Sequence, residues 1–188
     1  MPPVMACTGT DLPPRLDTWL PHAAIRTRHR RIAAAAPAVL WDAAQQIRLA
    51  ETRTLGRLVR WRIPGTPARL TYDQLFRSYP FTVLDEGERH LVSGLCGRIW
   101  TLQRDYPALA EPEEFRRWNR AGTVRVLFAH WVRELADGRA ELCSEARVEP
   151  VDRSSARRLR ALWVVIGRFD PLVAAESLSL AARRAAAG

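Results

Sequence analysis

The side chains best suited to acid–base or metal chemistry in this sequence are its four histidines, at positions 22, 29, 90 and 130. None stands at a zinc-ligand spacing from another histidine or from one of the three scattered cysteines, so no metal site and no cofactor are expected. The chain lacks a Gly-x-Ser-x-Gly turn, a glycine-rich phosphate loop and a His-Glu-x-x-His motif. No motif in the sequence therefore indicates hydrolase, nucleotide-dependent or metalloprotease chemistry. Ser93 beside Gly94 is expected to serve packing rather than nucleophilic attack.

His130 is the histidine whose sequence context indicates a function. It lies between Phe128 and Val132 on the apolar face of a run that alternates from Val124 to Val132, as expected for a strand. A neutral imidazole on an apolar face needs a hydrogen-bond partner, and the polar end of a bound ligand could supply one. A neighbouring side chain or a water molecule could satisfy the ring equally well. Both interpretations stay open at this point.

Glu145 and Arg147 offer a carboxylate and a possible partner for it, two residues apart in the following strand. Alternation places them on the face opposite Ser144, and Arg125 and Arg133 lie on the corresponding face of the preceding strand. Ion pairs across the strands on a solvent-facing surface are expected there, in preference to a catalytic role.

Composition limits the class of protein. The 188 residues are 47% apolar, which is enough for one domain with a real core. No apolar run reaches the roughly 18 residues that span a bilayer, and no secretory leader is recognisable, so a cytoplasmic protein without stable membrane insertion is expected. The net charge is +9 and all 29 basic residues are arginine. Because the arginines are spread along the chain without a recognised motif, no nucleic-acid partner is expected.

The pattern along the chain predicts an α+β domain. We interpret residues 1–22 as an irregular, proline-rich leader and residues 23–188 as the domain. A strand is expected over 24–32, followed by two short helices near 37–46 and 55–62. Further strands are expected over 81–84, 89–96 and 98–102, then a long hairpin through Asp137-Gly138. Its two strands should place Val126, Phe128 and His130 on the same sheet face as Ser144 and Val148.

A long C-terminal helix over 154–184 should cover the apolar face of this sheet, with Pro171 kinking it or cutting it in two. Leu159, Trp163 and Ile166 recur at helical spacing and are expected to face the sheet. Trp41 and Trp100 also fall in segments predicted to face inward. Aromatic side chains of this size either fill a core or line a cavity, and the sequence leaves both uses open.

Several segments of the chain resemble the START-like superfamily, also called SRPBCC, which includes polyketide cyclases and lipid-transfer domains. The resemblance covers residues 23–183. It rests on Ile32 and on the segments 36–41, 92–94, 97–100, 144–148 with Asp152, and 163–166. In a similar bacterial subgroup the fourth of these segments reads Thr-Glu-Thr-Arg-Val, whereas Ser144 and Ala146 replace the two threonines here. The pocket side therefore carries one hydroxyl fewer than in that subgroup.

The resemblance implies a helix-grip fold, in which a curved antiparallel sheet of six or seven strands wraps around a long C-terminal helix, with two short helices after the first strand. It also implies an apolar or amphipathic ligand, lipid-like or polyketide-like, in a cavity between sheet and helix. The alternative is a cyclase-type biosynthetic enzyme that uses the same cavity to fold its substrate. The side chains predicted to bind the ligand are Trp100, Phe128, His130, Ser144, Trp163 and Ile166.

Overall fold

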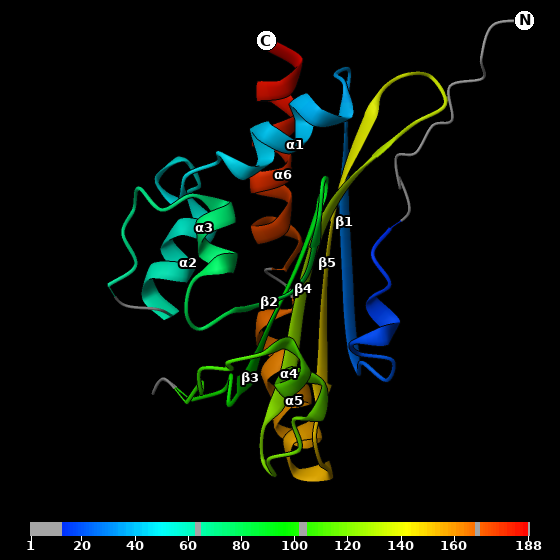
Figure 1. The fold of residues 1–188 in the computed structure, drawn as a ribbon. Helices are drawn as coiled ribbons and strands as arrows, with labels where there is room; N and C mark the ends of the chain where they lie inside the picture. Colours follow the sequence, from blue (N-terminus) through cyan, green and yellow to red (C-terminus); the bar gives the residue numbers. More distant parts are fainter. Residues whose placement is uncertain (1–12, 63–64, 102–104, 168–169, 188) are drawn as a thin grey trace, which may run out of the picture.

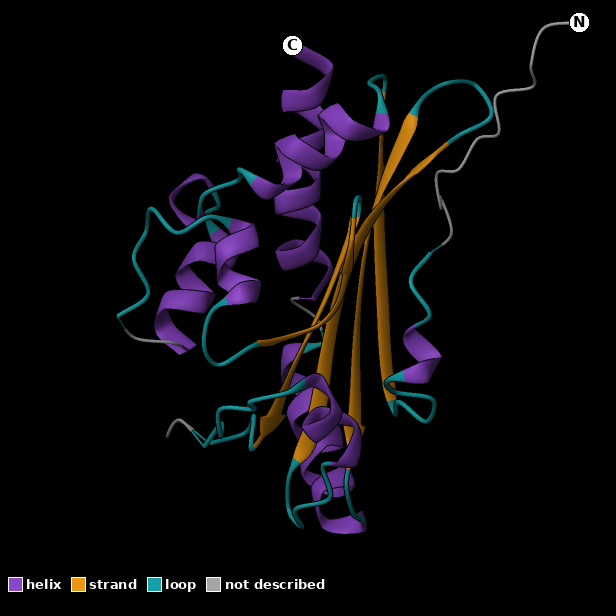
Figure 2. Ribbon diagram, viewed as in Figure 1, coloured by secondary structure: helices purple, strands orange, loops and turns teal. Residues whose placement is uncertain are grey.

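The computed structural model describes residues 13–62, 65–101, 105–167 and 170–187, in which one antiparallel sheet forms the centre of an α+β fold (Figures 1 and 2). Its five strands lie in the order β1-β5-β4-β3-β2. Their bounds are β1 Ile25–Ala33, β2 Thr82–Gly87, β3 His90–Gly97, β4 Val124–Glu134 and β5 Ala140–Pro150. The helices are α1 Pro37–Gln45, α2 Thr54–Arg62, α3 Tyr72–Arg77, α4 Pro112–Arg117, α5 Arg153–Ile166 and α6 Asp170–Ala187, with short 3-10 turns η1 Leu16–Thr18 and η2 Leu49–Glu51.

The register of the central hairpin is the one that alternation predicts. Phe128 pairs with Ala146 and His130 with Ser144, and Val126 and Val148 are also opposite each other. Residues directly opposite in an antiparallel pair point to the same face, so these side chains share one side of the sheet. Gly138, with a φ of 78°, completes the predicted turn between β4 and β5.

Helices cover this first face of the sheet along its whole length. Around α1 and α6, a buried cluster includes Leu40, Trp41, Leu142 and Leu178. Towards α5, a second cluster joins Val124, Val126 and Val148 to Leu159 of that helix. In Figure 1, α6 and α1 lie over one half of the sheet and α5 over the other. The first face is therefore the main core of the domain.

The opposite, second face is also buried over the central strands, which corrects the prediction that it is wet, whereas Arg26, Arg28 and Arg30 of β1 are exposed on it. Leu16 and Leu20 from the N-terminal segment and Phe115 of α4 pack on Leu127 and Trp131 of β4. Alternation along β4 places Leu127, Ala129 and Trp131 on this face. The N-terminal segment covers the apolar surface that these side chains form. The described part of the leader, residues 13–22, is thus packed against the sheet.

The sheet has five strands within the described residues, not six or seven, because residues 98–101, the described part of the strand expected over 98–102, form no strand. Gly97 has a φ of 144°, a conformation that residues with a side chain rarely adopt. The chain turns there, and the Arg98 N–H donates to the carbonyl of Asp105. A Cβ on Gly97 would lie 2.0 Å from that same carbonyl oxygen. The close approach of two backbone segments takes the place of a sixth strand.

The C-terminal helix is divided in two, as Pro171 predicts, with α5 ending at Ile166 and α6 beginning at Asp170. The Glu176 carboxylate of α6 accepts hydrogen bonds from the backbone N–H groups of Arg53, Thr54 and Leu55, at the start of α2. A carboxylate at a helix N-terminus satisfies donors that have no partner within the helix. Glu176 therefore ties α2 to α6, beside the region where side chains of α1, α3 and α6 meet.

Candidate functional site

A narrow cavity lies between the first face of the sheet and helices α1, α3 and α6. The cavity measures about 400 Å³ when the space at its open mouth is included. Only about 20 Å³ of this volume can hold the centre of a water molecule, which leaves room for one or two waters. The lining residues are Trp41, Ala44 and Gln45 of α1, Tyr72, Asp73 and Phe76 of α3, Leu91, His130 and Leu142 of the sheet, and Ser177 and Leu178 of α6. The walls are thus mainly apolar, with a few polar groups among them.

His130 is the buried polar group at the sheet wall of this cavity. Its side chain is 5% exposed, and the rings of Tyr72 and Phe76 lie 4.9 and 4.7 Å from it between centroids. Burial lowers the pKa of His130 to about 3, so the ring is neutral at physiological pH. Its Nε2 atom has no hydrogen-bond partner among the described residues. A buried imidazole nitrogen with no partner is uncommon and calls for a ligand or a water molecule.

Tyr72 brings a second polar group to the same place. Its side chain lies close enough to Ser177 of α6 and to Ser144, which lies opposite His130 in the sheet, for both serines to act on its pKa in the lowering direction. Burial raises the pKa of Tyr72 to about 12, so the phenol stays protonated. A capping box sets the start of α3: the Thr71 side chain accepts from the Gln74 N–H, and Gln74 accepts in turn from the Thr71 N–H. Tyr72, the first residue of α3, is directed at the sheet from that fixed start.

Polar side chains from two helices mark the rim of the cavity. Gln45 of α1 donates from Nε2 to Oδ1 of Asp73 at 3.5 Å. Arg77, one turn further along α3, donates from Nε to the same oxygen at 2.8 Å. The carboxylate of Asp73 therefore already has a cationic partner, and it holds α1 and α3 together at this edge of the cavity.

The structure brings together three of the six predicted ligand-binding residues. Phe128 and Ser144 share the sheet face of His130, and Phe128 packs against Phe76 and Phe81 with ring centroids 5.3 and 5.8 Å apart. Ser144 lies near Tyr72, but of these three residues His130 alone is among the described residues that line the cavity. The lining residues Tyr72 and Ser177 have no signal in the sequence beyond being polar residues in helical segments.

Two of the other three predicted residues, Trp100 and Trp163, lie away from this cavity. Trp100 follows β3 and packs beside the cluster near α5, with the Arg158 guanidinium 5.9 Å from the centroid of its ring. Trp163 is half-buried on α5, and neither tryptophan lines the cavity. Ile166 ends α5, and its side chain lies outside the described residues. For Trp163 the cause is the division of the C-terminal helix, because the described lining takes Ser177 and Leu178 from α6 and no residue from α5.

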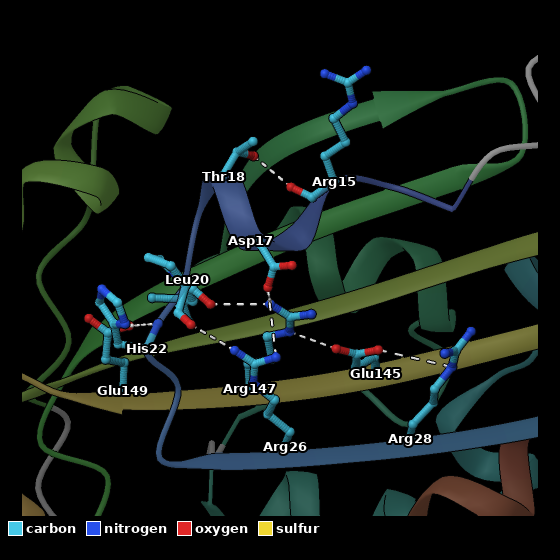
Figure 3. Close-up of polar contacts among 11 residues, drawn as sticks. Arg15, Asp17, Thr18, Leu20, His22, Arg26, Arg28, Glu145, Arg147 and Glu149 are labelled. Atoms are coloured by element: carbon cyan, nitrogen blue, oxygen red, sulfur yellow. Dashed lines mark hydrogen bonds and ion pairs between the residues drawn. The ribbon is translucent and has the colours of Figure 1, made fainter.

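The Glu145 and Arg147 side chains lie on the second sheet face, as predicted (Figure 3). Arg147 donates to Glu145 at 2.6 Å, to Asp17 of the N-terminal segment at 2.5 Å and to the Leu20 carbonyl at 3.1 Å. The Arg28 guanidinium on β1 lies 4.0 Å from Glu145. Hydrogen bonding to Arg147 lowers the pKa of Asp17. These charges hold the N-terminal segment on the sheet and do not face the cavity.

Cross-strand ion pairs also form where the sequence predicts them, between Arg125 and Glu149 and between Arg133 and Glu141. Across the described ranges, no group of three histidine, cysteine or acidic side chains is arranged to hold a metal ion. In the same part of the chain, no helix is long and apolar enough to cross a membrane.

Comparison with known proteins gives the chain no family. No protein-family model matches it, and no curated protein sequence does. A crystal structure of a hypothetical protein from Helicobacter pylori matches with a TM-score of 0.45 and 9% sequence identity, over 96% of this chain and 99% of that one.

Proposed function

We propose that this domain binds an apolar or amphipathic small molecule, lipid-like or polyketide-like, in the cavity between the sheet and the C-terminal helix α6. In this proposal the fold is of the helix-grip, START-like type, with α5 and α6 together in the place of the long C-terminal helix. The observation that carries it is the neutral, buried His130, whose ring packs against Tyr72 and Phe76 and whose Nε2 has no hydrogen-bond partner in the described structure.

A bound molecule would supply what the site lacks. Leaving a buried polar atom unpaired costs about 1 to 3 kcal/mol, and a ligand hydroxyl or carbonyl at Nε2 would recover much of that. The rings of Tyr72, Phe76 and Phe128 offer an apolar surface to the remainder of the molecule. Few, well-placed polar groups in an apolar wall are typical of small-molecule sites.

The narrowness of the cavity indicates how such a ligand enters. With about 20 Å³ open to water-sized spheres, anything larger than one or two water molecules must separate the lining side chains. Tyr72, Asp73 and Gln45 belong to two short helices at the rim. Binding should therefore move α1 and α3 relative to the sheet, and the free protein is the closed form.

The alternative, a cyclase-type enzyme, receives less support from the same groups. A general acid or base works best when its pKa lies near the working pH. The pKa of His130 is lowered to about 3 and that of Tyr72 is raised to about 12, both by burial. Both groups are thus uncharged and poor at exchanging protons near neutral pH, which favours binding over catalysis.

The test replaces His130 with phenylalanine, which keeps the ring shape and removes its hydrogen bonds. Displacement of an environment-sensitive fluorophore by polycyclic and long-chain ligands should be weakened by about 1 kcal/mol or more, while the melting temperature is unchanged or higher because no unpaired nitrogen remains. His22→Phe, an exposed position on the N-terminal segment, is the matched control. Oligonucleotides should not compete. Loss of stability with unchanged ligand affinity would show that His130 belongs to the protein's own polar network.

A further inference from the structure

The charge of the cavity lining restricts what kind of polar group a ligand can carry. No arginine is among the described lining residues, although the chain as a whole carries 29. The imidazole of His130 is neutral, because burial lowers its pKa to about 3. A carboxylate or phosphate placed beside His130 would therefore be desolvated without a counter-charge.

A positively charged ligand would gain little in this cavity either. The one carboxylate in the described lining, Asp73, accepts from Arg77 at 2.8 Å and from Gln45 at 3.5 Å. Asp73 thus already has a cationic partner, although Arg77 also pairs with Glu86 at 2.5 Å, and the Asp73 side chain is 22% exposed and therefore partly solvated. A ligand ammonium would have to compete with Arg77 for it.

Two polar groups on this face of the sheet have room for a further hydrogen bond, and both are uncharged: His130 lines the cavity, and Ser93 lies beside it, outside the described lining. His130 Nε2 and Ser93 Oγ are both buried and without a partner in the described part of the chain. Ser93 pairs with Phe128 and His130 pairs with Leu91 in the β3–β4 ladder, so Ser93 and His130 are diagonal neighbours on one face. A neutral imidazole and a hydroxyl can each accept or donate one hydrogen bond to a hydroxyl or carbonyl.

We infer that the ligand is an uncharged molecule with a hydroxyl or carbonyl group on an aromatic or aliphatic body, and that the site rejects the corresponding carboxylate. This inference rests on the proposed function, since it names the chemical class of the same ligand. The hydroxyl or carbonyl meets His130 Nε2, and the body lies against Phe76 and Phe128. Free fatty acids and other organic anions are excluded by the missing counter-charge.

The experiment compares pairs of probes that share an apolar body and carry either a neutral hydroxyl or a carboxylate. Naphthol is set against naphthoate and dodecanol against dodecanoate at neutral pH, by calorimetry or by displacement of a fluorophore from the full chain. In each pair the alcohol is expected to bind about tenfold tighter or more. Unsubstituted naphthalene, which lacks the hydroxyl, should bind the wild type more weakly than naphthol does. The His130→Phe variant should bind naphthalene and naphthol with equal affinity. His22→Phe should behave as the wild type, and the melting temperature of each variant is measured alongside.

The outcomes separate this inference from the proposed function. A carboxylate that binds as well as its alcohol would overturn the assignment of an uncharged ligand and leave the binding function intact. Alcohols that bind His130→Phe as tightly as the wild type would remove His130 from recognition, and the assignment with it. If no member of either pair binds the wild type, the proposed function itself fails. A preference for the alcohol over the carboxylate, together with a preference for naphthol over naphthalene that disappears in His130→Phe, supports both.

Discussion

Replacing Arg147 with methionine tests whether buried charges hold the N-terminal segment on the sheet. Arg147 is 7% exposed, and its guanidinium contacts Glu145, Asp17 and the Leu20 carbonyl (Figure 3). Methionine fills most of the space of the aliphatic stem and removes every donor. The change in the free energy of unfolding then reports the lost polar contacts and not a cavity.

The expected change in the free energy of unfolding depends on which partners Glu145 retains when Arg147 is removed. Removing one partner of a buried ion pair costs about 3 to 5 kcal/mol, because the other charge stays desolvated. Glu145 is 9% exposed and retains the Arg28 guanidinium at 4.0 Å. We therefore expect a loss of about 3 kcal/mol, at the lower end of that range. The Asp17 side chain is 72% exposed, so Asp17→Asn should cost much less than Arg147→Met.

Urea unfolding followed by circular dichroism measures these differences, with Arg15→Met as an exposed control on the same segment. The double change of Glu145→Leu with Arg147→Met should recover part of the stability, since no unpaired charge remains. A loss for Arg147→Met within about 0.5 kcal/mol of zero, the range of an ordinary surface substitution, would refute the reasoning. So would an Asp17→Asn variant that is equally unstable.

Two further predictions concern α5. Trp163 is half-buried, so Trp163→Ala should lower the free energy of unfolding by about 2 kcal/mol. Replacing a fully buried aromatic residue costs more, about 3 to 5 kcal/mol. A larger loss in urea unfolding would show that Trp163 is part of the core. The Asp152 carboxylate caps α5 by accepting from the Ser155 and Gly122 N–H groups, which lower its pKa to about 2. Because this pKa is below the unfolded value of about 3.9, the cap stabilises above pH 4 and is lost as the pH falls towards 2. The urea midpoint of Asp152→Asn should thus lie below the wild type at pH 6 and approach it at pH 3, and a constant difference would contradict the assignment.

Alternation along β4 and β5 was sufficient to predict the register that places His130. Side chains repeat every second residue in a strand, so the apolar set from Val126 to Val132 has one arrangement that buries it. Asp137-Gly138 specifies where the chain reverses. Phe128, His130 and Ser144 could therefore be placed on one face from the local pattern. Pro171 likewise predicted that the last helix is kinked or cut in two.

What completes the site is a matter of tertiary structure. Tyr72 and Ser177 are 105 positions apart and line the same cavity because α3 and α6 pack on the same half of the sheet. No local pattern carries that information, since propensity and periodicity describe an element and not its neighbour. The same holds at Gly97, where the carbonyl of Asp105 approaches too closely for a further strand, and at Arg147, which is buried by a leader that its own sequence marks as irregular. Local pattern determined the strands and their faces, whereas packing between distant segments decided which polar groups were left facing the cavity without a partner.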